Sequence, residues 1–318
     1  MNSYTVNNRK SRRKANDSSF FLEKPFFVSY MYMVQRKWRK YLDYIHALRA
    51  GMEHLEIGWP MKILVCIKQV PDPEMPVRVD EQGRVVRPEG DLKYWMNRAD
   101  EFAVEEAILI KEAGFGTTVD ALTVGPGHAA QVLERAMGMG ADNGVHILLQ
   151  EEDFLSPLNT ASYIAAYALN KGYDLILTGV MGEDHMQGQV GAMLAELLSF
   201  PCATSVIFEK IRDERGAVYV EREIEGGLRA TLELDLPAVL TVQTGINKPR
   251  YPMLSNLLRA KKQKALVVES HILGTAKDRE KVVRASYPGK SRAGLMLEGS
   301  GKDKAVRLLE ILEKAALI

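Results

Sequence analysis

Hydrophobic and polar positions repeat the same strand-then-helix pattern several times between residues 62 and 198. Short apolar runs have the length and composition of strands that are buried on both faces, and they lie at 62–67, 121–124, 144–149 and 175–178. A segment with helical spacing follows each run, and we expect these helices to end near residues 113, 139, 171 and 198. Strands that alternate with helices in this way predict a doubly wound, mostly parallel α/β sheet.

Two of these helices begin at residues that suit the N-cap position. Asn97 is expected to cap the first helix, with Asp100 and Glu101 in the first turn, where carboxylates favour the positive end of the helix dipole. Thr160 is expected to cap the third helix, which runs to Lys171.

Two hairpins are expected beside this alternating pattern. The first spans Val77–Val86 around a polar turn. The second starts with Val218, Val220 and Ile224, which alternate with polar residues and so predict a strand with one wet face. Gly226-Gly227 then makes a tight reversal, because both positions can take a positive φ without steric cost. The same alternation resumes in the returning strand.

After the second hairpin the chain is expected to return to the core and then to leave it. Residues 237–242 form a mostly apolar run of the kind that is buried on both faces. A proline-stiffened link at 247–252 leads into a short helix with a basic end. From Ser270 the chain is predicted to be an arm that ends in an amphipathic helix at about 302–316.

Charge and aromatic residues are distributed unevenly along the chain. Residues 1–60 carry 11 basic and 5 acidic side chains and 11 of the 24 aromatic residues, whereas the rest carries 31 basic and 36 acidic side chains. A mildly acidic body gives no electrostatic support for nucleic-acid binding. We expect residues 1–60 to be an extension outside the folded domain. A start codon assigned too far upstream would explain such an extension.

Several kinds of site are excluded because their motifs are missing. Cys66 and Cys202 are too few for a disulfide framework, which suits a reducing compartment and a cytoplasmic location. We expect no transmembrane segment, because no apolar run reaches 18 residues. We also expect no metal site, because no set of His, Cys and carboxylate residues has the spacing of metal ligands. Neither a Walker phosphate loop nor a strand–GxGxxG–helix fingerprint occurs.

Three loops at the carboxyl ends of the predicted strands are candidate ligand sites. They follow Cys66, begin at Val124, and span Gly179–Gln189. Glycines let backbone N–H groups approach a phosphate, and the helix that opens near Gln189 directs its positive dipole end to the same place. A plain connection between strand and helix is the alternative, and His185 in the third loop is expected to face solvent.

The order of residues around the second hairpin resembles the signature region of the electron transfer flavoprotein β subunit. The matching pieces are VEREIEGGLR, LPAVLT and NKPRY, and the resemblance extends from Met61 to about Gly294. It implies a fold of the adenine-nucleotide α-hydrolase-like type, with residues 61–269 as the nucleotide-binding domain. It also implies that residues 270–318 form an arm and helix that contact an α subunit.

The resemblance implies a set of nucleotide contacts by position. These are Cys66, Asn97, Arg98, Ala99, Asp100, Val124, Gly179, Val180, Met181, Gly182, Glu183, Asp184, Gln187, Gly188 and Gln189. The third loop departs from the family pattern, because Gly179–Asp184 lacks the basic residue that common members carry there. A possible phosphate partner is thereby removed, and AMP and a second FAD both remain candidates for the pocket.

The resemblance also implies how the chain works with partners. It would be a carrier subunit and not an enzyme, pairing with an α subunit that holds most of the FAD and accepting electrons from acyl-CoA-dehydrogenase-type donors. Membership of a bifurcating complex stays open. The segment that would dock on the donor contains an exposed leucine with polar and basic neighbours: Leu254, Asn256, Arg259, Lys261 and Lys262. Seating of the short helix by Leu254 and Leu257 is the alternative.

Two other functions can be weighed against this one. A stand-alone nucleotide-binding protein of the universal-stress type would need a Gly-x-x-Gly-x₉-Gly-[Ser/Thr] motif, which can be tried from Gly179 and Gly182. It fails at Ala192 and Met193. An enzyme that transfers AMP would need a Ser-Gly-Gly-type pyrophosphate loop, and none is present.

Overall fold

The computed structural model describes residues 60–75, 78–82, 85–86, 93–113, 116–150, 155–212, 216–274, 280–287, 294–315 and 317. The chain divides into two units, Met1–Ile57 and Gly58–Ile318, and the description below concerns the second. The expected extension at 1–60 lies outside the described residues except for Pro60, so its nature stays a prediction.

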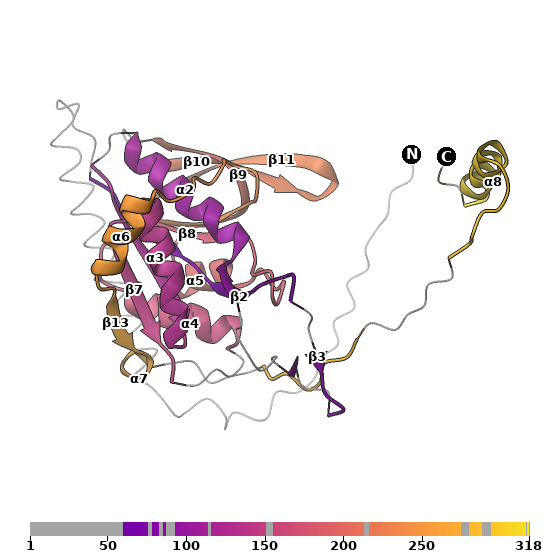
Figure 1. Ribbon diagram of the computed structural model, residues 1–318. Helices are drawn as coiled ribbons and strands as arrows, with labels where there is room; N and C mark the ends of the chain where they lie inside the picture. The colour runs from indigo at the N-terminus through magenta and orange to yellow at the C-terminus, as the bar shows by residue number, and fades with distance from the viewer. Residues whose placement is uncertain are drawn as a thin grey trace, which may run out of the picture. The chain divides into compact units, whose positions relative to one another are not determined.

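Nine strands of the described chain form one sheet, in the order β11-β10-β9-β12-β8-β1-β6-β7-β13 (Figure 1). All pairs from β9 to β13 are parallel, and the β9-β10-β11 end is antiparallel. The predicted mostly parallel sheet is thereby confirmed. The strands span Lys62–Cys66 (β1), Thr118–Gly125 (β6), Asn143–Leu148 (β7), Leu175–Gly179 (β8), Cys202–Arg212 (β9), Ala217–Ile224 (β10), Leu228–Asp235 (β11), Ala238–Val242 (β12) and Leu266–Glu269 (β13).

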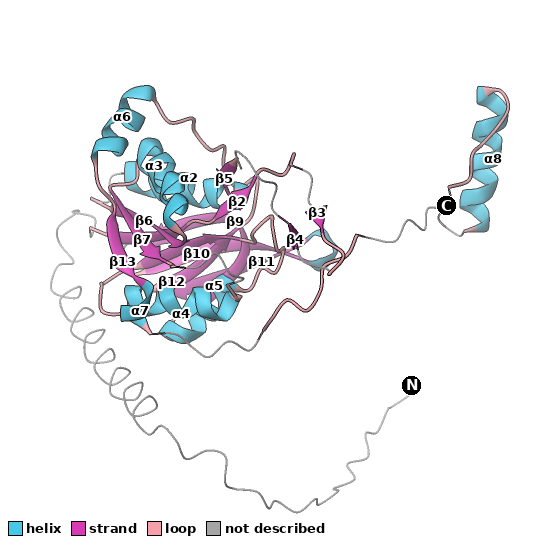
Figure 2. Ribbon diagram, turned by 60° about the horizontal axis from the view of Figure 1, so that its bottom comes forward, coloured by secondary structure: helices cyan, strands magenta, loops and turns pink. Residues whose placement is uncertain are grey.

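Helices cover both faces of this sheet, as the doubly wound prediction requires (Figure 2). One face carries α2 (Arg98–Glu112), α3 (Ala130–Met139) and α6 (Leu254–Lys262), and the other carries α4 (Pro157–Ala168), α5 (Val190–Leu198) and α7 (Ser270–Leu273). Each face has its own apolar core, the larger one under α2 and α3. None of the helices in the described part of the chain combines the length and apolar character needed to cross a bilayer.

Smaller elements lie between β1 and α2 and after β6. β2 (Gln69–Pro71) pairs with β5 (Tyr94–Met96), and β3 (Arg78–Val79) pairs with β4 (Val85–Val86). The antiparallel β3–β4 pair confirms the first predicted hairpin. A short 3₁₀ turn, η1 (Gly127–Ala129), precedes α3, and a separate helix, α8 (Gly301–Lys314), lies in the predicted arm.

The prediction that Thr160 caps the third helix is wrong. Ser156 is the N-cap of α4, and its hydroxyl accepts a hydrogen bond from the backbone N–H of Asn159 at 3.3 Å. Pro157 follows at the first helical position, where its missing N–H costs nothing and its fixed φ suits the helix. Thr160 lies inside the first turn, and its hydroxyl donates to the Ser156 carbonyl at 3.1 Å.

The second hairpin is present, but the burial of its apolar residues differs from the prediction at one position. Val218 and Val220 are buried, whereas Ile224 is exposed. Ile224 pairs with Leu228 of β11 beside the turn, and Leu228 is exposed as well, so the tip of the hairpin lies beyond the core. The turn at Gly226 and Gly227 has the positive φ angles expected.

Candidate functional site

The carboxyl ends of β1 and β8 lie side by side where the order of the strands reverses. From β1 the chain moves outward through β6 and β7, and it returns on the other side of β1 as β8 and β12. Ligands of open α/β sheets bind at such a point. The start of α2 lies at the same edge, because the backbone N–H of Asn97 donates to the Lys68 carbonyl at 2.9 Å. We call Lys68, Asn97, Asp100 and residues 179–189 the switch-point site.

Asp100 ties the ends of the two strands together. One of its carboxyl oxygens accepts from the backbone N–H of Lys68 at 2.7 Å, and the other accepts from the N–H of Gly179 at 3.0 Å. Burial raises the pKa of Asp100 to about 7, although the hydrogen bonds from Lys68, Asn97 and Gly179 partly oppose this shift. A single side chain from the first turn of α2 therefore sets the separation between the loops after β1 and β8.

Asn97 holds the loop after β8 and does not cap α2 with its side chain. It occupies the N-cap position, but its side chain makes no cap hydrogen bond. Its amide nitrogen donates to the Met181 carbonyl at 2.9 Å, and its amide oxygen accepts from the Glu183 N–H at 3.0 Å. The predicted position is thus confirmed, and the predicted role of the side chain is wrong, because this distant loop competes for the amide.

Two glycines, one in the site and one just after it, are required by close packing. A Cβ on Gly179 would collide with the Asp100 carboxylate and lie 2.8 Å from Ala99, at the N-terminus of α2. A Cβ on Gly191, in the first turn of α5, would collide with Thr241 and lie 2.9 Å from the Thr178 hydroxyl. Both α2 and α5 therefore approach the end of β8 more closely than any residue with a side chain would allow.

The first turn of α5 faces an exposed loop. Gln189 at its N-cap makes no side-chain cap hydrogen bond, and residues 187–189 are exposed. The first N–H groups of a helix have no partner within the helix, and the helix dipole makes this end electropositive. The arrangement is suited to an anionic group such as a phosphate.

Lys68 places a cation beside the loop 179–189, which contains no lysine or arginine of its own. Its ammonium nitrogen lies 2.6 Å from the Asp184 carboxylate and 3.4 Å from Nδ1 of His185. Partial burial lowers the pKa of His185, although the neighbouring Asp184 carboxylate opposes this shift. Sequence reasoning missed Lys68 because it belongs to the first loop, 116 residues before Asp184. Its place just after a buried strand was the signal that could have identified it.

Cys66 is the last residue of β1 at this edge of the sheet, and its thiol is unreactive. The side chain is buried, and burial raises the pKa of the thiol far above its usual range, with the charge of Asp100 adding to the effect. The thiolate needed for nucleophilic attack is therefore absent at neutral pH. Val124, near the end of the adjacent strand β6, is half-buried. Among the described residues, no group of three His, Cys, Asp or Glu side chains has metal-site geometry.

The structure thus brings together most of the contacts expected from the sequence. Asn97, Asp100 and the loop 179–189 are joined by hydrogen bonds, and Ala99 is buried against Gly179. Arg98 is exposed and takes no part in this network. That these residues bind a nucleotide stays a prediction.

A second candidate surface lies at α6 and the residues that lead into it. Tyr251, Met253, Leu254 and Leu258 are exposed, and Leu254 is 73% exposed. Leu257 behaves differently, since it packs against Gly138 of α3. The alternative that Leu254 and Leu257 both seat the helix is therefore wrong for Leu254. We call residues 251–262 the surface segment.

Cations follow the exposed apolar side chains of the surface segment along the chain. Arg259, Lys261 and Lys262 form the last turn of α6 and are exposed, whereas Asn256 is half-buried. Cations at the C-terminal end of a helix are stabilised by the dipole. The segment therefore presents a large apolar contact with positive charge beside it.

Comparisons with known proteins agree on one family. A sequence model described as the electron transfer flavoprotein domain matches residues 88–272. The mitochondrial electron transfer flavoprotein subunit β of Oryza sativa subsp. indica is 39% identical over 241 residues, covering 74% of this chain and 93% of that protein. Electron transfer flavoprotein subunit β of Homo sapiens is 35% identical over 254 residues, covering 79% of this chain and 98% of that protein.

Proposed function

The chain belongs to the electron transfer flavoprotein β-subunit family, and from this membership we propose that it pairs with an α subunit to form an electron carrier. The FAD of this carrier is held mainly by the α subunit and, when bound, supplies the group that is reduced and reoxidised. Members of the family carry electrons and are not enzymes. The chain's own part is to support the flavin-bearing subunit, to bind a nucleotide and to present a surface to the donor.

We propose the switch-point site as the place where the nucleotide binds. The loop glycines and the N-terminus of α5 suit a phosphate, and Lys68 supplies the cation that the loop itself lacks. Asp100 and Asn97 hold the surrounding loops at a fixed separation before any ligand arrives. The occupant is AMP or the adenine nucleotide part of a second FAD, and both have the phosphate that this arrangement favours.

The observation that carries the proposed electron-transfer role is the exposure of Leu254 beside the cations of the surface segment. An apolar anchor supplies buried area in a complex, and surrounding charges steer the encounter. A donor of the acyl-CoA-dehydrogenase type with an acidic rim around an apolar patch fits this surface. The predicted cytoplasmic location stays a prediction.

The test is to co-express the full chain with its α subunit, purify the complex and release its nucleotides by heat. We expect a yellow heterodimer with FAD and one further nucleotide. One FAD and one AMP indicate a simple carrier, and two FAD indicate the bifurcating type. A colourless homodimer that binds ATP contradicts the proposal, because it indicates a stand-alone nucleotide-binding protein.

A further inference from the structure

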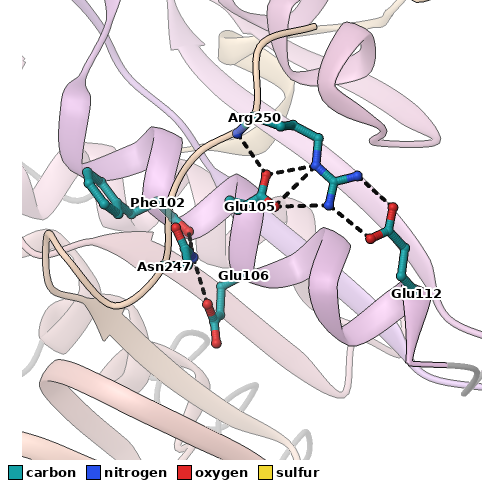
Figure 3. A network of polar contacts seen from close by, with 6 residues as sticks. All are labelled: Phe102, Glu105, Glu106, Glu112, Asn247 and Arg250. Carbon is teal, nitrogen blue, oxygen red and sulfur yellow. Dashed lines mark hydrogen bonds and ion pairs between the residues drawn. The ribbon is translucent and has the colours of Figure 1, made fainter.

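The surface segment is held in place by one arginine that precedes it. The Arg250 guanidinium lies between two carboxylates of α2 (Figure 3). Its Nε and Nη2 each donate to Glu105 at 2.9 Å, and its Nη1 and Nη2 donate to Glu112 at 2.6 and 2.9 Å. The backbone N–H of Arg250 also donates to Glu105 at 3.1 Å.

The two carboxylates are arranged to receive a planar guanidinium. Glu105 and Glu112 are seven residues apart, which places them on the same face of α2, two turns from one another. Arg250 therefore spans about 10 Å of the helix surface. A lysine has the same charge but offers a single ammonium and cannot bond both carboxylates in this forked manner.

The side chains of Glu105, Arg250 and Glu112 differ in how far they are exposed to solvent. The Glu105 side chain is only 5% exposed, whereas those of Arg250 and Glu112 are 33% and 55% exposed. The hydrogen bond from Arg250 lowers the pKa of Glu112. Because Glu105 is covered, it has no surface with which to touch another protein. Its carboxylate accepts hydrogen bonds from Arg250, and through these bonds Glu105 can affect docking.

Two further residues, Asn247 and Leu257, fix the same stretch of chain. The Asn247 amide nitrogen donates to the Phe102 carbonyl at 2.9 Å and to Glu106 at 2.7 Å, both on α2 (Figure 3). On the other side, Leu257 packs against Gly138 of α3. The chain is thus anchored before and within the surface segment, and Tyr251, Met253 and Leu254 point outward between the anchors.

The same helix also frames the switch-point site. Asn97 and Asp100 hold that site from the N-terminal end of α2, and Glu105 and Glu112 hold Arg250 from the rest of it. A helix is stiff along its axis, so the surface segment has a defined position relative to the switch-point site.

We propose that Arg250 is a positioning residue, which by bridging Glu105 and Glu112 pre-organises the exposed group Tyr251, Met253 and Leu254 for docking. The proposal rests on the proposed docking function of the surface segment. A segment ordered before the encounter has less conformational freedom to lose on binding, and this favours the complex. Arg250 acts through its neighbours, because its Nε, Nη1 and Nη2 atoms all donate to carboxylates of α2.

The test compares four variants of the heterodimer: Glu105→Gln, Arg250→Lys, Leu254→Ala and, as a control, Lys248→Gln. Lys248 is an exposed cation two residues from Arg250 that does not belong to the network. Backbone hydrogen exchange across 251–262 reports how firmly the segment is held. Steady-state reduction by an acyl-CoA dehydrogenase supplied with its acyl-CoA reports docking, through the KM for the heterodimer and through kcat.

We expect Glu105→Gln and Arg250→Lys to speed exchange in 251–262 by about tenfold or more and to raise KM by about fivefold to twentyfold with little change in kcat. Leu254→Ala is expected to raise KM without changing exchange. Lys248→Gln is expected to change neither, and nucleotide content is expected to stay constant throughout.

Two outcomes separate the two proposals. If Leu254→Ala leaves KM unchanged, the docking function is wrong, and exchange still tests whether Arg250 holds the segment. If Leu254→Ala raises KM but Glu105→Gln and Arg250→Lys change neither exchange nor KM, the positioning role of Arg250 is overturned. Should Glu105→Gln fail to fold, Arg250→Lys carries the same comparison.

Discussion

At the scale of single residues, the switch-point site depends on polar side chains that connect distant loops and on glycines that leave room for them. Asp100 bonds backbone groups from two strand ends, and Gly179 lies directly against the Asp100 carboxylate. Neither residue needs to touch a ligand to control the site. Their effect is on how far apart the surrounding loops are held.

The substitution Gly179→Ala should therefore prevent nucleotide binding at the switch-point site. The added methyl would collide with Asp100 and press on Ala99, and overpacking of this kind costs about 1–3 kcal/mol. We expect a heterodimer that has lost most of the second nucleotide, with a Tm lower by several degrees. The amount of nucleotide released by heating measures the first effect, and calorimetry measures the second.

Gly294→Ala is the matched control, because a Cβ there meets nothing within 4 Å. It should keep both the nucleotide and the Tm. Full nucleotide content in Gly179→Ala would contradict the placement of the nucleotide at the switch-point site.

At the scale of elements, a pair of carboxylates lies between β9 and α2. Glu209 on β9 and Glu106 on α2 are within reach of each other, and burial raises the pKa of both carboxyl groups. Burial and the neighbouring Glu106 charge raise the pKa of Glu209 to about 8. Glu105 adds further negative charge near Glu106, while the Asn247 amide donates to Glu106.

This pair should make stability depend on pH in a defined direction. The folded-state pKa of Glu209 is above its usual value of 4.5, so its contribution is fully present below about pH 4.5 and is lost as pH rises through about 8. We expect Glu209→Gln, which stays neutral and still donates to Glu106, to gain stability relative to the unaltered protein as pH rises from 5 to 9. Urea unfolding at several pH values measures this difference.

The exposed carboxyl of Glu225, in the turn between β10 and β11, provides the control. Glu225→Gln should shift stability by a similar small amount at every pH. A Glu209→Gln variant whose difference from the unaltered protein does not grow with pH would contradict the raised pKa of Glu209.

At the scale of the whole molecule, the chain carries more apolar surface than its own fold covers. No residue of α8 is buried, and Val306, Leu308 and Leu309 are exposed, although a capping box of Ser300 and Asp303 starts the helix well. A helix of this length is marginal on its own in water and is usually stabilised by packing of its apolar face. We propose that α8 packs on the α subunit.

Removal of residues 275–318 should separate folding from assembly. We expect the sheet domain to keep its cooperative thermal transition, because its two cores lie before Gly274, and to lose co-purification with the α subunit. The double change Val306→Lys and Leu309→Lys should act in the same direction, whereas Lys304→Gln on the same helix should not. Normal heterodimer yield after the truncation would contradict this role of the arm.

The sequence by itself determined the elements whose signal is local. The alternation of apolar runs with helical segments predicted most of the parallel sheet, the pair Gly226-Gly227 predicted the turn, and the residue order around Val218–Lys262 predicted the family. The strand β9 was missed, because its exposed and buried positions are interrupted by a register shift and by a positive φ at Ser205.

Only the tertiary structure decided what the individual polar side chains do. Asn97 was a cap by position, and the fold directed its side chain to Met181 and Glu183. The loop after β8 lacked a cation in sequence, and the fold supplied Lys68. These contacts join residues far apart in the chain, and a hydrogen bond depends on distances of a few tenths of an ångström that no local pattern encodes.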